Sequence, residues 1–312
     1  MSITVTPFKT GIGADVSGVD LSAISEADVQ AIKDAWIAHQ VLRFRGQKLD
    51  DDALANFSAN FGELEGAPIG FKTRSYKTDR PEVTVISNIK IGGEAIGGLG
   101  DGEAEWHSDM TYIDLPPDAS ALYSLEVPAS GGDTWFMNMY DAYDALSDEM
   151  KAKLRGLTCK HDATRSSDGR LRSGYQETYT REELPGAVHP LVIQHPESGR
   201  KALYLGRRLN AHVMELSPAE SDTLLDQLWA HVRNHAKTWS QQCLATWRRG
   251  HVGQSLHHAS PRCLRPRRPP ADAPHPSAWQ RQASRGLAHY LVQSGNGTRT
   301  KRCSRSRKIM SG

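Results

Sequence analysis

A histidine and an aspartate stand one residue apart in the segment Glu-Trp-His-Ser-Asp-Met-Thr-Tyr at 105–112. On an extended strand, side chains at i and i+2 point to the same face, so His107 and Asp109 can offer a nitrogen and an oxygen to one metal ion. A second histidine would complete the ligand set of non-haem Fe(II) oxygenases. The pair alone is a weak signal, because such a triplet is more often a surface turn in which the aspartate accepts a hydrogen bond.

Two further blocks follow this pair along the chain. The first reads Gly-Gly-Asp-Thr-Trp-Phe at 131–136, and the second runs from His189 to Tyr204. Together with Phe-Gly-Glu-Leu at 61–64, their order and spacing closely resemble the taurine dioxygenase and 2,4-dichlorophenoxyacetate dioxygenase family. The resemblance runs from near residue 3 to near residue 242.

This resemblance implies an Fe(II)- and 2-oxoglutarate-dependent dioxygenase. His107 and Asp109 match two of the three iron ligands, and Thr134 matches the threonine that hydrogen-bonds the carboxylate of 2-oxoglutarate. The implied reaction consumes dioxygen, converts 2-oxoglutarate to succinate and CO2, and oxidises a C–H bond of a small organic substrate. The iron carries the difficult chemistry, and the protein orients the substrate and excludes side reactions.

The substrate is the least determined feature. Family members that act on taurine carry a histidine just after Phe-Gly-Glu-Leu, whereas this chain has Glu-Gly-Ala-Pro at 65–68, which argues against taurine. Arg74 and Lys77 could meet an anionic substrate, and Asn88 could contact it. Solvated loop charges and an ordinary strand-end asparagine are the plainer interpretations of these residues. Other residues are interpreted as structural or as packing residues: His161, Asp162, His189, His195, Trp106 and Tyr112.

Apolar periodicity predicts many short strands and a few helices in residues 3–242. Capping patterns place helix starts at Ser25 and Ser217 and a helix break at Ser147. A glycine-rich loop at 92–102 is expected to lead into a strand that carries His107. This pattern favours a mainly β fold with flanking α, and the resemblance implies the same double-stranded β-helix, or jelly roll.

Charge divides the chain at Cys243. The 312 residues have a net charge of +2, yet residues 243–312 carry 14 Lys or Arg and a single acid, Asp272. That segment therefore has a charge of +13 against −11 for residues 1–242. No signal peptide or membrane span is recognisable, and the cysteines show no metal or disulfide spacing. A cytoplasmic location without a membrane partner is expected, and a homo-oligomer is compatible with the sequence.

Three explanations of this basic segment compete: a disordered arm that binds nucleic acid, an unusual domain, or translation in the wrong reading frame. If codons are read one base later, Gly253 to Pro261 can encode Asp-Asn-Arg-Cys-Thr-Met-His-Arg. Continued through Pro276, the string resembles the family's C-terminal motif, which carries the second iron histidine and the 2-oxoglutarate arginine. The frameshift is the favoured explanation.

The frameshift has a chemical consequence. In the chain as written, the iron histidine would have fallen near Ala259 and the arginine near Pro270. His257 or His258 could replace the histidine, although exposed loop histidines are the plainer interpretation. We therefore predict an incomplete dioxygenase-like domain at 1–242 and a basic, out-of-frame, disordered tail at 243–312. The competing hypothesis is an inactive remnant whose tail binds nucleic acid or anionic surfaces, with nucleic acid the weaker prediction.

Overall fold

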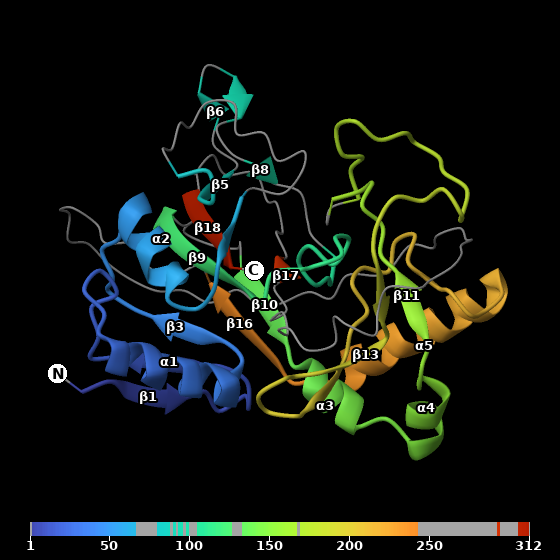
Figure 1. Cartoon of the computed structure of the whole chain (residues 1–312), viewed down its shortest axis with the longest axis horizontal. Helices are drawn as coiled ribbons and strands as arrows, with labels where there is room; N and C mark the ends of the chain where they lie inside the picture. Colours follow the sequence, from blue (N-terminus) through green and yellow to red (C-terminus); the bar gives the residue numbers. More distant parts are fainter. Residues whose placement is uncertain are drawn as a thin grey trace, which may run out of the picture.

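The computed structural model describes residues 2–66, 80–87, 90–91, 93–95, 98–99, 105–126, 133–166, 169–242, 292–293 and 305–311. Short strands predominate among the described elements, with helices at both ends of the molecule (Figure 1). This arrangement agrees with the predicted mainly β class with flanking helices. Within these residues, no helix is both long and apolar enough to cross a membrane.

The N-terminal sheet has the order β1-β2-β3 and consists of β1 (Thr4–Pro7), β2 (Ala14–Ser17) and β3 (Leu42–Phe44). β1 and β2 run antiparallel, whereas β2 and β3 run parallel and are connected through helix α1 (Glu26–His39). The helix begins as predicted, because Ser25 accepts a hydrogen bond from the Asp28 amide and the Asp28 carboxylate accepts one from Ser25.

Helix α2 (Asp51–Ala59) buries Leu54 and Phe57 against the N-terminal sheet. Phe61 lies beyond the helix end and packs edge-on against Phe57 at 5.1 Å between ring centroids. The helix ends at Asn60, whose side-chain amide donates to the carbonyl oxygens of Asn56 and Phe57. A side chain that satisfies the last carbonyls ends the helix without losing the apolar contact.

Strands from distant parts of the chain pair in the middle of the molecule. One sheet has the order β4-β18-β5-β8 with β9 paired to β18, and its strands are β4 (Leu64–Glu65), β5 (Thr84–Ser87), β8 (Gly98–Leu99), β9 (Ala119–Glu126) and β18 (Arg305–Ser311). All four residues of β5 are buried. A second sheet, β16-β10-β17, contains β10 (Asp133–Met137), β16 (Thr238–Gln242) and β17 (Val292–Gln293).

Two of these strands, β17 and β18, belong to the segment predicted as an out-of-frame tail. Their backbones pair with β10 and with β5 and β9, respectively. The other residues between 243 and 312 lie outside the described residues. The domain boundary at 243 and the disorder of the tail therefore stay predictions.

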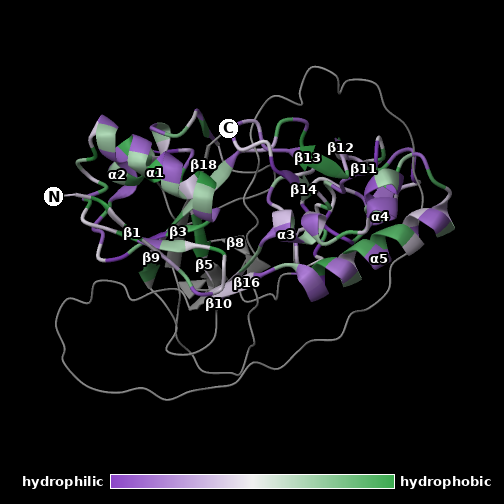
Figure 2. Cartoon of the chain, turned by 90° about the horizontal axis from the view of Figure 1, so that it is seen from below, coloured by the Kyte–Doolittle hydropathy of each residue, from purple (hydrophilic) through white to green (hydrophobic). Residues whose placement is uncertain are grey.

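The other half of the molecule is built on helix α5 (Pro218–His235). Its buried apolar side chains are Leu224, Leu225, Leu228, Trp229 and Val232, and Figure 2 shows apolar and polar segments alternating along the helix. The helix opens with the predicted capping box between Ser217 and Glu220. Around it lie α3 (Met139–Asp144), β11 (Thr158–Lys160), β12 (Val188–Pro190), β13 (Val192–Gln194), β14 (Lys201–Leu203) and β15 (His212–Val213).

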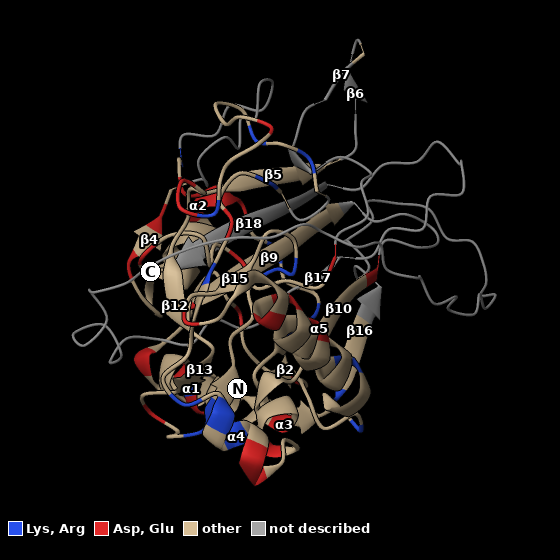
Figure 3. Ribbon diagram, turned by 90° about the vertical axis from the view of Figure 1, so that its right-hand side faces the viewer, with Lys and Arg blue, Asp and Glu red and all other residues tan. Residues whose placement is uncertain are grey.

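Helix α4 (Asp148–Lys153) is separated from α3 at Ser147, whose hydroxyl caps the new helix by accepting from the Met150 amide. This break is the one predicted from the sequence. Acidic side chains occupy the first turn of α4 and lysines its last turn (Figure 3), the distribution that the helix dipole favours. The remaining short hairpin joins β6 (Lys90–Ile91) to β7 (Glu94–Ala95).

Candidate metal centre

His107 and Asp109 lie in an irregular segment between β8 and β9. Residues 105–108 adopt neither helix nor strand, and a turn begins at Asp109, followed by Met110 with φ of 51°. The prediction that His107 lies on a strand is therefore wrong. The physical reason is that the Ser108 amide donates to the Gly206 carbonyl at 3.0 Å, a single anchoring bond, and the positive φ then reverses the chain.

The two side chains nevertheless converge, with 3.3 Å between His107 Nε2 and Asp109 Oδ1. His107 Nδ1 lies 2.7 Å from the Glu105 carbonyl oxygen, and because a carbonyl only accepts, Nδ1 must carry the proton. Nε2 of a neutral ring then directs a lone pair at a carboxylate oxygen. Such an arrangement is stable only with a second proton or a metal cation between the two atoms.

The pair fits a metal ion by position and by donor chemistry. Metal–ligand bonds of about 2.0–2.2 Å place two donors at right angles roughly 3 Å apart. The side chains are only 6% and 15% exposed, so little water competes for them. No group of three or more His, Cys, Asp or Glu that could hold a metal occurs among the described residues. The third-ligand candidates His257 and His258 lie outside those residues.

Thr134 lies on β10 with its side chain buried. Its backbone pairs with Gln241 of β16 and Gln293 of β17. Met137, at the other end of β10, lines a pocket together with His107. Strand β10 therefore borders the segment that carries His107 and Asp109. The contact of Thr134 with 2-oxoglutarate stays a prediction.

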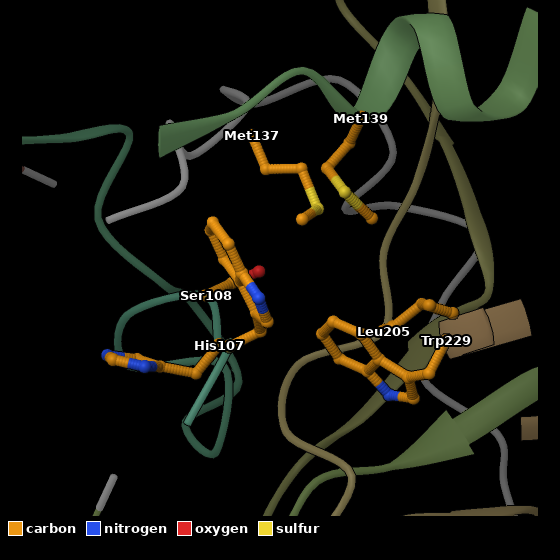
Figure 4. A pocket seen from close by; sticks show the side chains of 7 residues that line it. His107, Ser108, Met137, Met139, Leu205 and Trp229 are labelled. Atoms are coloured by element: carbon orange, nitrogen blue, oxygen red, sulfur yellow. The ribbon is translucent and has the colours of Figure 1, made fainter. Parts of the chain in front are cut away.

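The pocket beside His107 is apolar. It is lined by Trp106, His107, Ser108, Met137, Met139, Leu205 and Trp229. Figure 4 shows the imidazole of His107 pointing away from the two methionines, so the ring nitrogens of His107 do not face the interior of this pocket. Trp106 packs against the main core, as expected for a packing residue.

Two arginines lie over the ring of Tyr112, which follows Asp109 in the chain. The guanidinium carbon of Arg172 lies 3.9 Å from the centre of the Tyr112 ring, and that of Arg207 lies 5.8 Å from it. Burial raises the pKa of Tyr112, and the two arginines partly offset this effect. Burial and the neighbouring Arg172 lower the pKa of Arg207 to about 10.

Sequence reasoning missed both arginines. Arg207 follows the buried residues 202–206, and a charge directly after such a run was a usable signal of a buried or partnered cation. Arg172 sits in the long excursion after β11 and carried no signal. The earlier candidates Arg74, Lys77 and Asn88 lie outside the described residues.

The other histidines make contacts internal to the fold. His189 Nε2 lies 3.0 Å from the Ile113 carbonyl oxygen, and its ring packs edge-on against His161 and Tyr204. His195 Nδ1 accepts from two backbone amides of the turn after β13. These contacts agree with the structural roles expected for these residues.

The buried histidines make stability depend on pH. Burial lowers the pKa of His189 to about 4 and that of His212 to about 3. Histidines of the unfolded chain titrate near 6.5, so below that pH the unfolded state binds protons that the folded state excludes. We expect the urea midpoint to fall between pH 7 and pH 5, and to fall less in His189→Gln. Equal midpoints at both pH values would contradict this expectation.

Comparison with known proteins identifies the chain. The model of the "Taurine catabolism dioxygenase TauD, TfdA family" matches residues 4–252. The chain belongs to this family. The match begins and ends within about ten residues of the limits that the motifs predicted.

Several characterised members of the family are similar to the chain. It is 33% identical over 260 residues to the alpha-ketoglutarate-dependent 2,4-dichlorophenoxyacetate dioxygenase of Cupriavidus pinatubonensis, covering 79% of this chain and 89% of that relative. It is 31% identical over 264 residues to the alpha-ketoglutarate-dependent sulfate ester dioxygenase of Pseudomonas putida, covering 79% and 81%. A taurine dioxygenase structure from Burkholderia xenovorans has a TM-score of 0.68 at 24% identity, over 100% of this chain and 89% of that one.

These similarities confirm three predictions. The fold is the mainly β jelly roll with flanking helices shared with the structural relative. The chain is a member of a family of 2-oxoglutarate-dependent dioxygenases. Fe(II) is the metal of these enzymes, and 2-oxoglutarate, dioxygen and a small-molecule substrate are their reactants.

Proposed function

We propose that this family member oxidises a C–H bond of a small anionic organic substrate and releases succinate and CO2, with His107 and Asp109 as two of its metal ligands. The observation that carries the proposal is the 3.3 Å approach of His107 Nε2 to Asp109 Oδ1 with the ring proton held at Nδ1. Both donors face the same point, where only a proton or a cation can lie.

Bound Fe(II), together with 2-oxoglutarate and dioxygen, supplies the oxidising chemistry. The protein's own residues prepare the site for it. The Glu105 carbonyl holds the His107 proton at Nδ1, and the Ser120 hydroxyl donates to Asp109 Oδ2 at 3.4 Å, on the oxygen that faces away from the imidazole. The Ser108 amide donates to the Gly206 carbonyl oxygen and so holds the segment that carries His107 and Asp109. Thr134 would donate to a carboxylate of 2-oxoglutarate.

On the frameshift explanation, the chain as written lacks the segment expected to supply the third ligand and the 2-oxoglutarate arginine. We therefore expect it to bind metal weakly and to turn over slowly. A charge of +13 on residues 243–312 favours a second candidate function, an inactive remnant whose tail binds nucleic acid or anionic surfaces. Salt-sensitive binding of arbitrary DNA that disappears when residues 243–312 are deleted supports this second function.

The metal ligands are tested by titrating the full chain with Mn(II) and following the loss of the free-ion paramagnetic resonance signal. Asp109→Ala should weaken binding by at least about 100-fold, because a ligand contributes more than the outer partners whose loss costs 10–100-fold. Asp114→Ala removes an exposed carboxylate from the same turn region and serves as the matched control. Equal Mn(II) affinities for the two variants would contradict the assignment of Asp109 as a metal ligand.

A further inference from the structure

Arg172 and Arg207 are two cations that converge on one side chain near the metal centre. Both guanidinium groups lie over the Tyr112 ring, and Arg172 is close enough to Arg207 to lower its pKa. Asp109 also acts electrostatically on Arg207 and on Tyr112, so the pair lies within reach of the metal ligand's charge. Two like charges held together are unfavourable unless an anion lies near them.

The protein places the two guanidinium groups by specific contacts. Arg207 donates through Nη1 to the Arg165 carbonyl oxygen at 2.7 Å. The backbone amide of Arg172 donates to the Thr164 carbonyl oxygen at 2.7 Å, and the Arg172 guanidinium carbon lies 3.9 Å from the centre of the Tyr112 ring. The Arg207 side chain is thus held by a hydrogen bond, and the Arg172 side chain by its contact with the Tyr112 ring.

Neither guanidinium is neutralised within the described part of the chain. Arg207 Nε and Arg172 Nη1 are buried and make no hydrogen bond to the described residues, and no ion pair among those residues includes either arginine. Asp162, which also acts electrostatically on Arg207, already accepts from Thr164 and Asn210. A buried N–H donor without a partner destabilises the folded state. An oxyanion that accepts from this donor removes the destabilisation.

We propose that Arg172 and Arg207 bind the acidic group of the substrate, a carboxylate, sulfonate or sulfate, beside the metal centre. The assignment rests on the proposed function, because it takes the bound anion to be the substrate of that centre. The cosubstrate is the other anion of the reaction, but its predicted contact, Thr134, lies on β10, whereas Arg172 and Arg207 come from the excursion and from the segment after β14. The pair is therefore assigned to the substrate.

The test is calorimetric titration of the full chain, without metal, with phenoxyacetate, with its uncharged analogue phenoxyacetamide, and with inorganic sulfate. We expect at least one of the two anions to bind, and phenoxyacetate to bind at least about tenfold more tightly than the amide. Arg172→Gln should weaken anion binding by about tenfold or more and leave amide binding unchanged. Arg233→Gln, an exposed arginine of α5, is the control and should change neither.

Three results would overturn the proposal. They are equal affinity for phenoxyacetate and phenoxyacetamide, equal anion affinity in the two variants, or displacement of the bound anion by 2-oxoglutarate, which would assign the pair to the cosubstrate. Thermal unfolding of Arg172→Gln shows whether a loss of binding reflects a loss of fold. The Mn(II) titration described above fails or succeeds independently of these anion titrations, so a failure of the metal assignment is recognised separately.

Discussion

Reading the codons one base later from Gly253 onward is expected to raise the Mn(II) affinity of the chain by at least about 100-fold and to produce succinate from 2-oxoglutarate at a correspondingly higher rate. The shifted sequence adds the imidazole that completes the two-histidine, one-carboxylate ligand set and the arginine expected to pair with 2-oxoglutarate. The measurement is Mn(II) titration and succinate formation with added Fe(II), compared between the two full-length chains.

The shifted chain carrying Asp109→Ala provides the control. It should lose the gained affinity, because the restored histidine needs the His107 and Asp109 pair to form a three-ligand site. If the shifted chain binds Mn(II) no better than the chain as written, the frameshift explanation fails. Resequencing the gene around codon 243 is the direct check, and a confirmed uninterrupted frame would defeat it as well.

Gly206→Ala is expected to lower the free energy of unfolding by about 3–5 kcal/mol, near the upper end for single substitutions. Gly206 has φ of 61°, and an added Cβ would overlap the His161 ring and lie 2.9 Å from Thr111 Oγ1. His161 is fully enclosed and cannot move aside. The carbonyl of Gly206 also holds the Ser108 amide, so Mn(II) binding should weaken along with stability.

Gly46→Ala is the matched control for this substitution. Gly46 has a similar φ of 71°, but nothing lies within 4 Å of an added Cβ. Its substitution should cost only the roughly 1–2 kcal/mol of a left-handed non-glycine residue. Urea unfolding of both variants separates the backbone cost from the steric one, and equal losses would show that His161 does yield to the added methyl group.

Local signals predicted much of the fold. The starts of α1 at Ser25, of α4 at Ser147 and of α5 at Ser217 follow from side-chain caps, which act within three residues and are therefore readable from the chain. The burial of β5 follows from its apolar run. The helix end at Asn60 was missed, because a side chain that ends a helix has the same composition as one that continues it.

The candidate site was only partly predictable. The pairing of His107 with Asp109 was found through a motif, although the strand invoked to explain it is absent and a turn at Met110 brings the side chains together instead. Arg172 and Arg207 are 35 residues apart in the sequence and meet at Tyr112 only after the excursion folds back. No periodic pattern encodes such a meeting.

The sequence by itself determined the family, the order of the motifs and the two side chains proposed as metal ligands, because these depend on residue types at short or family-specific spacings. Only the tertiary structure decided that a glycine carbonyl from beyond β14 anchors the segment that carries His107 and Asp109, and that two arginines without a carboxylate partner among the described residues meet at Tyr112 nearby. Both features arise from contacts between segments far apart in the chain, whose energies depend on distances that a linear pattern does not contain.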